Sequence, residues 1–186
     1  MYSVAQLGGS SPPDDWENAF APYDETTYAT ALDALHSDDI VLDIGAGDLR
    51  FARRAAERVQ RVIAIEQRAE LLNVRVPSNV EIICGDARVL EFPKQISTAV
   101  LLMRHCQHFA LYRAKLERAD CARLITNARW GMDVEVMNLR APRQNYADVL
   151  CGWYACECGR VGFKFGDDCA VQNVTQVKFC PRCFSD

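Results

Sequence analysis

Short apolar runs that end at turns recur along most of this 186-residue chain and constrain its fold more than any other feature. The runs are rich in Val, Ile and Leu, as is typical of strands buried on both faces. Between several of them lie segments whose apolar residues have helical spacing. Strands that alternate with helices predict an α/β fold with a doubly wound, mostly parallel sheet and right-handed crossovers. The expected strands are 40–44, 61–66, 80–84, 98–103, 123–126 and 134–137, and the expected helices are 24–35, 51–59, 68–72 and 112–121.

The chain divides by composition into three parts. Residues 1–22 contain a Gly-, Ser- and Pro-rich stretch, and we expect a flexible arm there. Residues 23–145 carry the alternating pattern of the α/β domain. Residues 150–186 are rich in cysteine and aromatic residues without helical spacing, so we expect a small, separate β segment.

Charge and hydropathy limit the classes of function. The net charge of −4 disfavours a protein whose main task is unspecific nucleic-acid binding. The segment 140–143 has two arginines, which together with Arg123 and Arg129 can form a local path for phosphate. No apolar run approaches the roughly 18 residues of a membrane span, and no export signal is recognisable, so we expect a cytoplasmic protein. The oligomeric state is not predicted.

Acidic residues stand at the ends of three consecutive expected strands. Asp43 precedes the turn Gly45-Ala46-Gly47, Glu66 ends the second strand, and Asp86 follows the third. Ligands of open α/β sheets bind at the carboxyl ends of the strands, where glycines allow close approach of the backbone. There Asp43 can orient backbone amides or hold an ammonium group, Glu66 can accept hydrogen bonds from ribose hydroxyls, and Asp86 can accept one from an adenine amino group.

With these residues, the stretch from Tyr23 to Leu139 resembles the class I methyltransferase family, whose cofactor is S-adenosylmethionine. The resemblance implies that the turn 43–47 wraps the methionine part of the cofactor, that Glu66 binds the ribose, and that Asp86 lies beside the adenine. The segment 20–24 is similar to one that closes over the cofactor in several subfamilies. The implied cofactor-binding residues are Tyr23, Asp43, Gly45, Ala46, Gly47, Glu66, Gln67, Asp86 and Ala87.

At two positions after this turn, the chain differs from the glycine patterns of methyltransferases and of nicotinamide-binding proteins. Many members of the family have a third glycine where this chain has Leu49, so we expect a tighter or differently shaped turn. A nicotinamide-binding fold needs a glycine at position 50 in its Gly-x-Gly-x-x-Gly pattern, and Arg50 stands there instead. The methyltransferase resemblance is therefore preferred.

The methyl acceptor is expected beyond the fourth strand, in the segment 102–108. The Asn/Asp-Pro-Pro-aromatic motif of many enzymes that methylate planar amides or adenine amino groups is absent there. His105 is the candidate catalytic base, because a neutral imidazole accepts a proton near physiological pH. His105 and His108 can instead cap or pack at the start of the next helix, Arg104 is a candidate anion ligand or a solvated surface residue, and Cys106 is expected to be an ordinary buried thiol.

Two cysteine pairs in the C-terminal segment predict a structural zinc site. Cys156-Glu157-Cys158 and Cys180-Pro181-Arg182-Cys183 have the spacing of two knuckles that form a tetrahedral thiolate cage, a zinc ribbon. Four thiolates leave no open position, so Zn²⁺ is expected to stabilise a segment too small to fold alone. Cys151 or Cys169 can replace one ligand. The phenylalanines of the segment, which are Phe163, Phe165, Phe179 and Phe184, are expected to form its core, although an exposed one can stack on a base.

The sequence thus predicts an S-adenosylmethionine-dependent methyltransferase with a structural zinc ribbon. Ribbons fused to enzymes usually present a surface to a macromolecule, which favours RNA or protein as the substrate over a small molecule. Two alternatives stay open. One is a non-catalytic scaffold or partner subunit that retains the cofactor pocket, and the other is a small-molecule methyltransferase whose ribbon serves as a lid or dimer contact.

Overall fold

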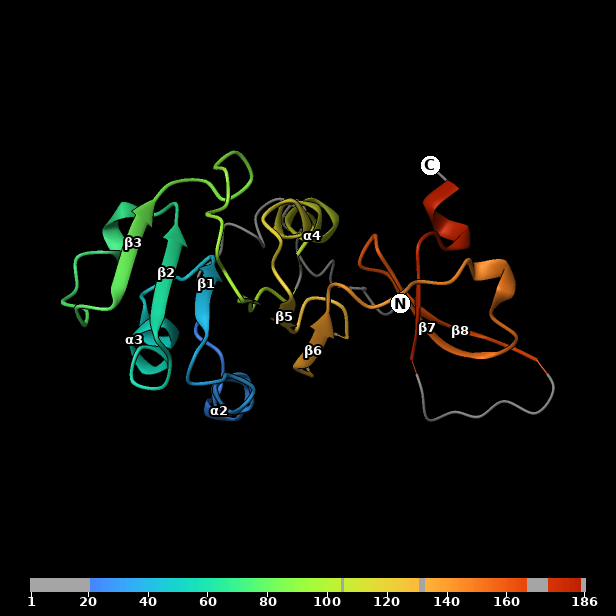
Figure 1. The fold of residues 1–186 in the computed structure, drawn as a ribbon, viewed down its shortest axis with the longest axis horizontal. Helices are drawn as coiled ribbons and strands as arrows, with labels where there is room; N and C mark the ends of the chain where they lie inside the picture. The colour runs from blue at the N-terminus through green and yellow to red at the C-terminus, as the bar shows by residue number, and fades with distance from the viewer. Residues whose placement is uncertain (1–20, 105, 131–132, 167–173, 185–186) are drawn as a thin grey trace, which may run out of the picture.

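The computed structural model of the protein describes residues 21–104, 106–130, 133–166 and 174–184. A six-stranded sheet with its helices forms the larger part, the sheet domain, and a three-stranded sheet forms the smaller part, the ribbon (Figure 1). The expected flexible arm lies outside the described residues, apart from 21 and 22. Among the residues described, no helix has the length and apolar character needed to cross a membrane.

The larger sheet has the strand order β3-β2-β1-β4-β5-β6. Neighbouring strands from β3 to β5 pair in parallel, so the expected doubly wound, mostly parallel α/β sheet is confirmed. The order reverses between β1 and β4, which is the switch point where ligands of such sheets bind. The bounds are β1 Ile40–Ile44, β2 Arg61–Glu66, β3 Val80–Cys84, β4 Thr98–Leu101, β5 Arg123–Thr126 and β6 Glu135–Asn138.

Apolar side chains cover both faces of this sheet. On one face, α2 (Glu25–Asp33) and α3 (Arg50–Ala55) pack on the alternate residues Val41, Val62 and Val100. On the other face, α4 (Phe109–Arg118) packs on the intervening residues, such as Leu42 and Leu101. The two layers explain why the central strands read as continuous apolar runs.

The last strand departs from the parallel pattern. β6 runs antiparallel to β5, because only eight residues separate Thr126 from Glu135. A parallel connection needs a crossover of about a dozen residues or more. The strand was expected from the sequence, and its direction follows from the length of the loop.

All four helices differ from their expected bounds. The first is shorter at both ends, and the second, α3, ends at Ala55 instead of 59. The segment 68–72 forms only the 3₁₀ turn η1 (Ala69–Leu71), with no buried residue. The helix expected at 112–121 is α4, which begins three residues earlier at Phe109 and ends where Asp120 takes a positive φ of 58°. Phe109 is buried, so packing extends the helix beyond the range indicated by its spacing pattern.

The ribbon consists of β7 (Gly152–Cys156), β8 (Val161–Lys164) and β9 (Thr175–Val177), with β7 in the centre. The 3₁₀ turn η2 (Tyr146–Asp148) precedes it, and η3 (Pro181–Phe184) closes it. Its buried centre is Val149, Cys156, Val177 and Cys180. For Phe165 and Phe179 the expected place in the core is wrong, since they are 88% and 55% exposed and cysteines occupy the small interior instead. Phe163 is half-buried, and the side chain of Phe184 is not described.

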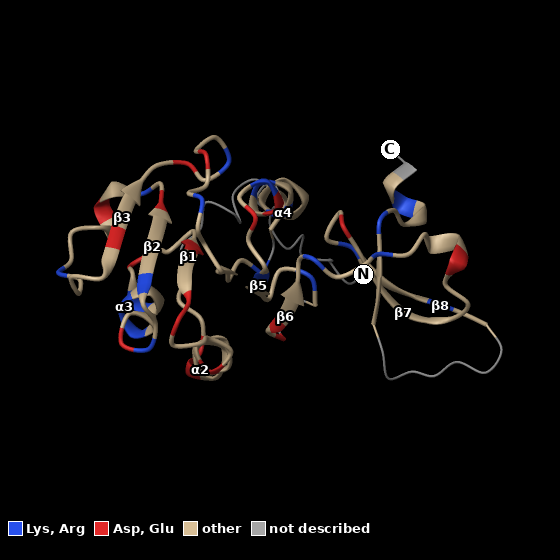
Figure 2. Cartoon of the chain, viewed as in Figure 1, with Lys and Arg blue, Asp and Glu red and all other residues tan. Residues whose placement is uncertain are grey.

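Ion pairs and close packing hold the ribbon against α4. Glu157, between the first two cysteines, lies 3.0 Å from Arg113 and 2.9 Å from Arg143, and Arg143 also reaches Glu117 at 2.6 Å. A Cβ added at Gly159 would lie 3.0 Å from atoms of the Phe109 side chain, so the knuckle rests directly on the start of α4. Figure 2 shows charged residues of both signs throughout the sheet domain, while β7 and β8 carry few.

Candidate functional site

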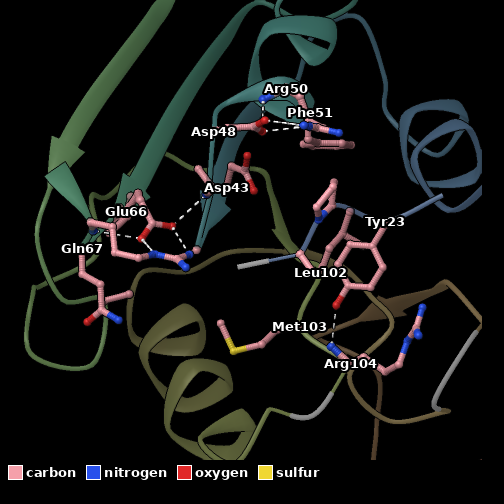
Figure 3. Close-up of a pocket in the computed structure, with 18 of the residues that line it drawn as sticks. Tyr23, Asp43, Asp48, Arg50, Phe51, Glu66, Gln67, Leu102, Met103 and Arg104 are labelled. Carbon is pink, nitrogen blue, oxygen red and sulfur yellow. Dashed lines mark hydrogen bonds and ion pairs between the residues drawn. The ribbon is translucent and has the colours of Figure 1, made fainter. Parts of the chain in front are cut away.

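A cavity of about 490 Å³ opens at the carboxyl ends of β1 to β4. Its volume lies within the range of small-molecule sites. Figure 3 shows Glu66 and Gln67 on one side of it and Tyr23 with Leu102 on the other. The cavity brings together every residue that the sequence assigned to cofactor binding: Tyr23, Asp43, Gly45, Ala46, Gly47, Glu66, Gln67, Asp86 and Ala87.

The turn after β1 forms the floor of the cavity. Gly45 and Gly47 have φ values of 72° and 55°, a region that favours glycine. The amides of Gly45 and Ala46 both donate to the carbonyl oxygen of Ile65 at 2.9 Å. A Cβ at Gly45 would lie 3.1 Å from the Cε of Met103, so the glycine keeps this floor clear.

Leu49 keeps the left-handed conformation at the position of the family's third glycine. Its φ is 62° and its ψ 14°, and it directly precedes α3. The side chain is 0% exposed and belongs to the core between α2, α3 and the sheet. Burial of an aliphatic side chain therefore offsets a backbone conformation that costs a non-glycine residue about 1 to 2 kcal/mol.

Asp43 has a buried carboxylate oxygen without a partner. Its Oδ2 has no hydrogen bond within the described residues, although the residue is only 4% exposed. Burial, aided by the charge of Glu66, raises the pKa of Asp43 to about 7. The turn amides donate to Ile65 and Glu66, so of the two roles open for Asp43, holding an ammonium group fits the geometry better.

Glu66 is fixed from two sides at the end of β2. It accepts hydrogen bonds from the Gly47 amide at 2.8 Å and from the amide and Nε of Arg68 at 3.0 and 2.9 Å. Burial alone would raise the pKa of Glu66, but these hydrogen bonds outweigh it and hold the pKa below its usual range. A carboxylate has about four acceptor sites, and Arg68 Nη2 donates a fourth hydrogen bond to Glu66 at 3.3 Å, so a ligand hydroxyl would replace the Arg68 side chain there.

Asp86 lies at the rim, beyond β3. Its carboxylate accepts from the Arg88 amide at 2.8 Å and from the Arg88 side chain at 2.9 and 3.0 Å. The side-chain hydrogen bond from Arg88 is the main cause of the lowered pKa of Asp86. The carboxylate is thus ionised at neutral pH, with both oxygens in contact with Arg88.

Sequence reasoning missed a repeated acid–x–Arg pattern around this cavity. After each of the first three strands, an arginine pairs with an acid two residues before it, and the side-chain distances are 2.5, 2.9 and 2.8 Å in chain order. All six side chains line the cavity. The spacing could have been read from the sequence as Asp48-Leu49-Arg50, Glu66-Gln67-Arg68 and Asp86-Ala87-Arg88.

The far wall of the cavity joins the N-terminal segment to the end of β4. Tyr23 accepts a hydrogen bond on its Oη from the Arg104 amide at 2.8 Å, and the Arg104 guanidinium lies 5.2 Å from the centre of the Tyr23 ring. Leu102 and Met103, expected within the strand, have left it and line the cavity (Figure 3). Tyr23 was predicted here, but its contact with Arg104 was not.

The catalytic candidate His105 lies outside the described residues. His108 takes the position before α4 but makes no capping hydrogen bond with its side chain, and its ring stands edge-on to Tyr112 with 6.5 Å between centres. Cys106 is half-buried and lines a second hollow rather than this cavity. The role of His105 stays a prediction.

The four cysteines of the two knuckles form one cluster. Their sulfur atoms all lie within 4.8 Å of one another, with 3.6 Å between Cys156 and Cys183 and 3.9 Å between Cys158 and Cys180. Four sulfurs at about 2.3 Å from one tetrahedral ion stand about 3.8 Å apart, so the donor set fits Zn²⁺. Cys151, a possible replacement ligand, is disulfide-bonded, and Cys169 lies outside the described residues.

The arginines expected to form a phosphate path are instead engaged within the protein. Arg123 pairs with Asp39 at 2.6 Å, at the amino ends of the strands and away from the cavity. Arg129 pairs with Glu135 at 2.6 Å and has a fully buried side chain, while Arg140 pairs with Asp120 at 2.9 Å and Arg143 with Glu117 and Glu157. The expected path is therefore wrong, because intramolecular carboxylates neutralise it.

Comparison with known proteins gives a matching family and several relatives. A family model described as "Methyltransferase domain" matches residues 42–127, which run from β1 through β5 and include the floor of the cavity. "Probable ribosomal RNA small subunit methyltransferase A" of Methanosarcina barkeri (strain Fusaro / DSM 804) is 44% identical over 61 residues, 30% of this chain and 21% of that protein. The protein of the same name from Methanosarcina mazei is 40% identical over 65 residues, 32% of this chain and 24% of that protein.

The chain thus spans between 21% and 24% of the length of these curated relatives. Among solved structures, the YcgJ protein from Bacillus subtilis has a TM-score of 0.48 and 21% sequence identity, covering 55% of this chain and 50% of its own.

Proposed function

We propose that the chain is a class I methyltransferase that transfers a methyl group from S-adenosylmethionine to a macromolecule, which the match of residues 42–127 to a methyltransferase family model supports. The observation that carries the proposal is the convergence of all nine cofactor residues expected from the sequence on one cavity. The unpartnered Oδ2 of Asp43 within that cavity supports a ligand with a positively charged group.

Each wall of the cavity has a chemical role in this proposal. Asp43 binds the ammonium group of the methionine part, and the Gly45–Gly47 turn lets that part lie against the backbone. Glu66 accepts from the ribose hydroxyls beside Arg68, and Asp86 accepts from the adenine amino group. The cofactor supplies an electrophilic methyl group, so the protein has to orient donor and acceptor and exclude competing water.

RNA is the macromolecule that we favour. Support comes from the two Methanosarcina relatives, both of which are named "Probable ribosomal RNA small subunit methyltransferase A". His105 follows Arg104 at the end of the cavity and is the proposed base where the acceptor must lose a proton. The cytoplasmic location expected from the sequence is part of the same proposal.

The cysteine cluster is proposed to hold a structural Zn²⁺. Cys156, Cys158, Cys180 and Cys183 would supply all four ligands and so leave no position for a reacting group. The proposed boundaries are 23–145 for the methyltransferase domain and 150–186 for the zinc ribbon. On this proposal the ribbon recognises the substrate and takes no part in the chemistry.

Calorimetric titration of the zinc-loaded protein with S-adenosylmethionine, S-adenosylhomocysteine and NAD tests the pocket. We expect micromolar binding of the two sulfur compounds and none of NAD. Asp43→Asn and Glu66→Gln should each weaken binding by about 10- to 100-fold, as for a lost hydrogen bond to a charged group. Asp33→Asn, an exposed acid on α2, is the matched control and should bind like the unchanged protein.

No binding of either sulfur compound would contradict the proposed function. Binding without methyl transfer to any RNA or protein pool would favour the non-catalytic scaffold. Transfer to metabolites alone would favour a small-molecule methyltransferase.

A further inference from the structure

A second hollow, of about 450 Å³, lies between the ribbon and the sheet domain. From the sheet domain Cys106, Phe109 and Ala128 line it, and from the ribbon Gly159, Arg160 and Arg182 do so. Each knuckle contributes one arginine: Arg160 lies two residues after Cys158, and Arg182 lies between Cys180 and Cys183. The hollow is therefore built by the fold of the ribbon against α4.

The hollow borders the place where the methyl acceptor is expected. Arg104 lines the cofactor cavity, and Cys106, two residues later, lines the second hollow. The Cys106 amide donates to the Met103 carbonyl oxygen at 3.0 Å, so residues that line the two spaces are in direct contact beyond β4. In Figure 1, α4 and the red C-terminal turn lie toward the edge to which β1, β2 and β3 point.

The two arginines differ from the other arginines around the ribbon. Arg113, Arg129 and Arg143 are engaged by carboxylates. Arg160 and Arg182 are exposed, and within the described residues neither guanidinium has a hydrogen bond or ion pair. Cys158 and Cys183 also line the hollow, and thiolates there would bring negative charge, but among the described lining residues there is no Asp or Glu. The two guanidinium groups therefore have no carboxylate partner in the lining and stay open to a phosphate.

Packing keeps these charges at a defined place relative to the cofactor cavity. Gly159 rests on Phe109, and Glu157 is tied to Arg113 on α4. Guanidinium groups bind phosphate in a bidentate manner and suit recognition of a phosphate backbone. In a nucleic acid every base has a neighbouring phosphate, so a nucleotide can enter the cofactor cavity while the adjoining backbone lies on the hollow.

We propose that Arg160 and Arg182 bind the phosphate backbone of a single-stranded RNA substrate next to the nucleotide that is methylated. This inference rests on the proposed function and deepens it by naming the surface that recognises the substrate. Single-stranded RNA is favoured because its bases are free to leave the stack and enter a cavity. The ribbon then positions the acceptor, and its zinc holds the two arginines in place.

The test is a fluorescence-anisotropy titration of the zinc-loaded, full-length chain with a labelled single-stranded RNA of mixed sequence, at salt concentrations from about 50 to about 200 mM. The variant R160Q/R182Q should weaken binding about tenfold or more. It should also reduce the salt slope by about 1.4, since each contact with a single strand contributes about 0.7. The control R53Q/R75Q removes two other exposed arginines that have no ion pair among the described residues, and it should bind like the unchanged protein.

Zinc content and cofactor binding are measured on the same samples. Retained zinc with lost RNA affinity supports the proposal. Loss of zinc in R160Q/R182Q would overturn it, because the arginines would then serve the thiolate cluster. Equal effects of the two double variants, or equal competition by a polyglutamate peptide, would also overturn it. Failure of the unchanged chain to bind S-adenosylmethionine contradicts the proposed function alone, so the two failures are distinguishable.

Discussion

Single residues around the cofactor cavity are held in states that cost stability. Asp43 is an acid in a fully buried position, and Leu49 has a backbone conformation that favours glycine. Both occur in one turn, between β1 and α3. Strain and unsatisfied groups of this kind are common at functional sites, where a ligand or the surrounding core compensates for them.

The pH dependence of stability should report on Asp43. Its pKa is about 7 in the folded protein, compared with 3.8 for an unperturbed aspartate side chain. Between these values the folded state binds more protons than the unfolded state, so the free energy of unfolding falls as pH rises toward 7. In urea denaturation, the free energy of unfolding of the unchanged protein should fall by about 2 to 3 kcal/mol between about pH 5 and pH 8, at about 1.4 kcal/mol per pKa unit. Asp43→Asn should not show this fall.

Asp33→Asn, on the exposed face of α2, should leave that slope unchanged. A slope that is the same in Asp43→Asn and the unchanged protein would show that Asp43 ionises in the fold without cost.

Leu49 should respond to truncation in an unusual order. Leu49→Ala leaves a cavity and keeps the positive φ, which costs about 2 to 5 kcal/mol. Leu49→Gly leaves a slightly larger cavity but relieves about 1 to 2 kcal/mol of backbone strain. The glycine variant should therefore be at least as stable as the alanine variant in denaturant unfolding.

Leu116, fully buried in α4, is the matched control. There glycine should be about 1 kcal/mol less stable than alanine, the usual helical order. The same order at both positions would argue against strain at Leu49.

At the scale of helices and strands, the ribbon is the element for which we propose a dependence on a bound metal. Its buried centre consists of two valines and two cysteines. So small a core cannot offset the entropy of ordering the segment. Metal binding would supply the difference, because ligands that are dispersed in the unfolded chain are gathered by the ion.

Removal of the metal should unfold the ribbon and spare the sheet domain. With a chelator or in Cys180→Ser, the amides of β7 to β9 should lose their protection from hydrogen exchange, while those of β1 to β5 stay protected. The affinity for S-adenosylmethionine should change less than twofold, which is about 0.4 kcal/mol. Cys84→Ser, an exposed cysteine in β3, should keep one zinc per chain. Equal protection of the ribbon with and without metal would contradict a stabilising role.

Strands were predicted more closely than helices or loops, for a physical reason. A run such as Ile40–Ile44 is apolar because both faces of the sheet are covered, and that condition is written in the run itself. The start of α4 depends on Phe109 packing against Gly159, fifty positions later in the sequence, which no local pattern reveals. The direction of β6 followed only from its loop length, and the exposure of Phe165 from the cysteines that take its expected place.

The acidic residues of the candidate site were predicted from the sequence, whereas its arginines were missed. Asp43, Glu66 and Asp86 follow strands, so topology alone brings them together. The arginines that pair with two of them were given no role in the sequence analysis, because an ion pair depends on rotamers that sequence does not specify. For the same reason the arginines expected to bind phosphate turned out to be neutralised, whereas Arg160 and Arg182 were not singled out.

At the scale of the whole molecule, ion pairs hold the ribbon against α4. Arg113 is only 6% exposed in its side chain, and Glu117 and Glu157 both reach it. Burial lowers the pKa of Arg113, while the two glutamates oppose that effect. A buried cation that depends on carboxylates from two parts of the chain couples those parts energetically.

Glu157→Gln should weaken the contact between the ribbon and α4. Arg113 and Arg143 would lose a shared carboxylate, and we expect a loss of about 1 to 3 kcal/mol, less than for a fully buried pair because Glu157 is 28% exposed. Thermal unfolding should then show the ribbon separating at a lower temperature than the sheet domain. Glu25→Gln, which removes an exposed pair with Arg54, should change stability by less than about 0.5 kcal/mol.

An unchanged unfolding profile in Glu157→Gln would mean that the packing of Gly159 on Phe109 is sufficient to dock the ribbon.

Two tryptophans meet where the ribbon joins the sheet domain. Trp130 follows β5 and Trp153 lies in β7, and their ring centres are 5.9 Å apart at an interplanar angle of 75°. Indoles this close share their electronic transitions, so the pair should give a split circular-dichroism band that disappears when the rings separate. The circular-dichroism spectrum of the unlabelled protein should therefore report whether the ribbon and the sheet domain are in contact.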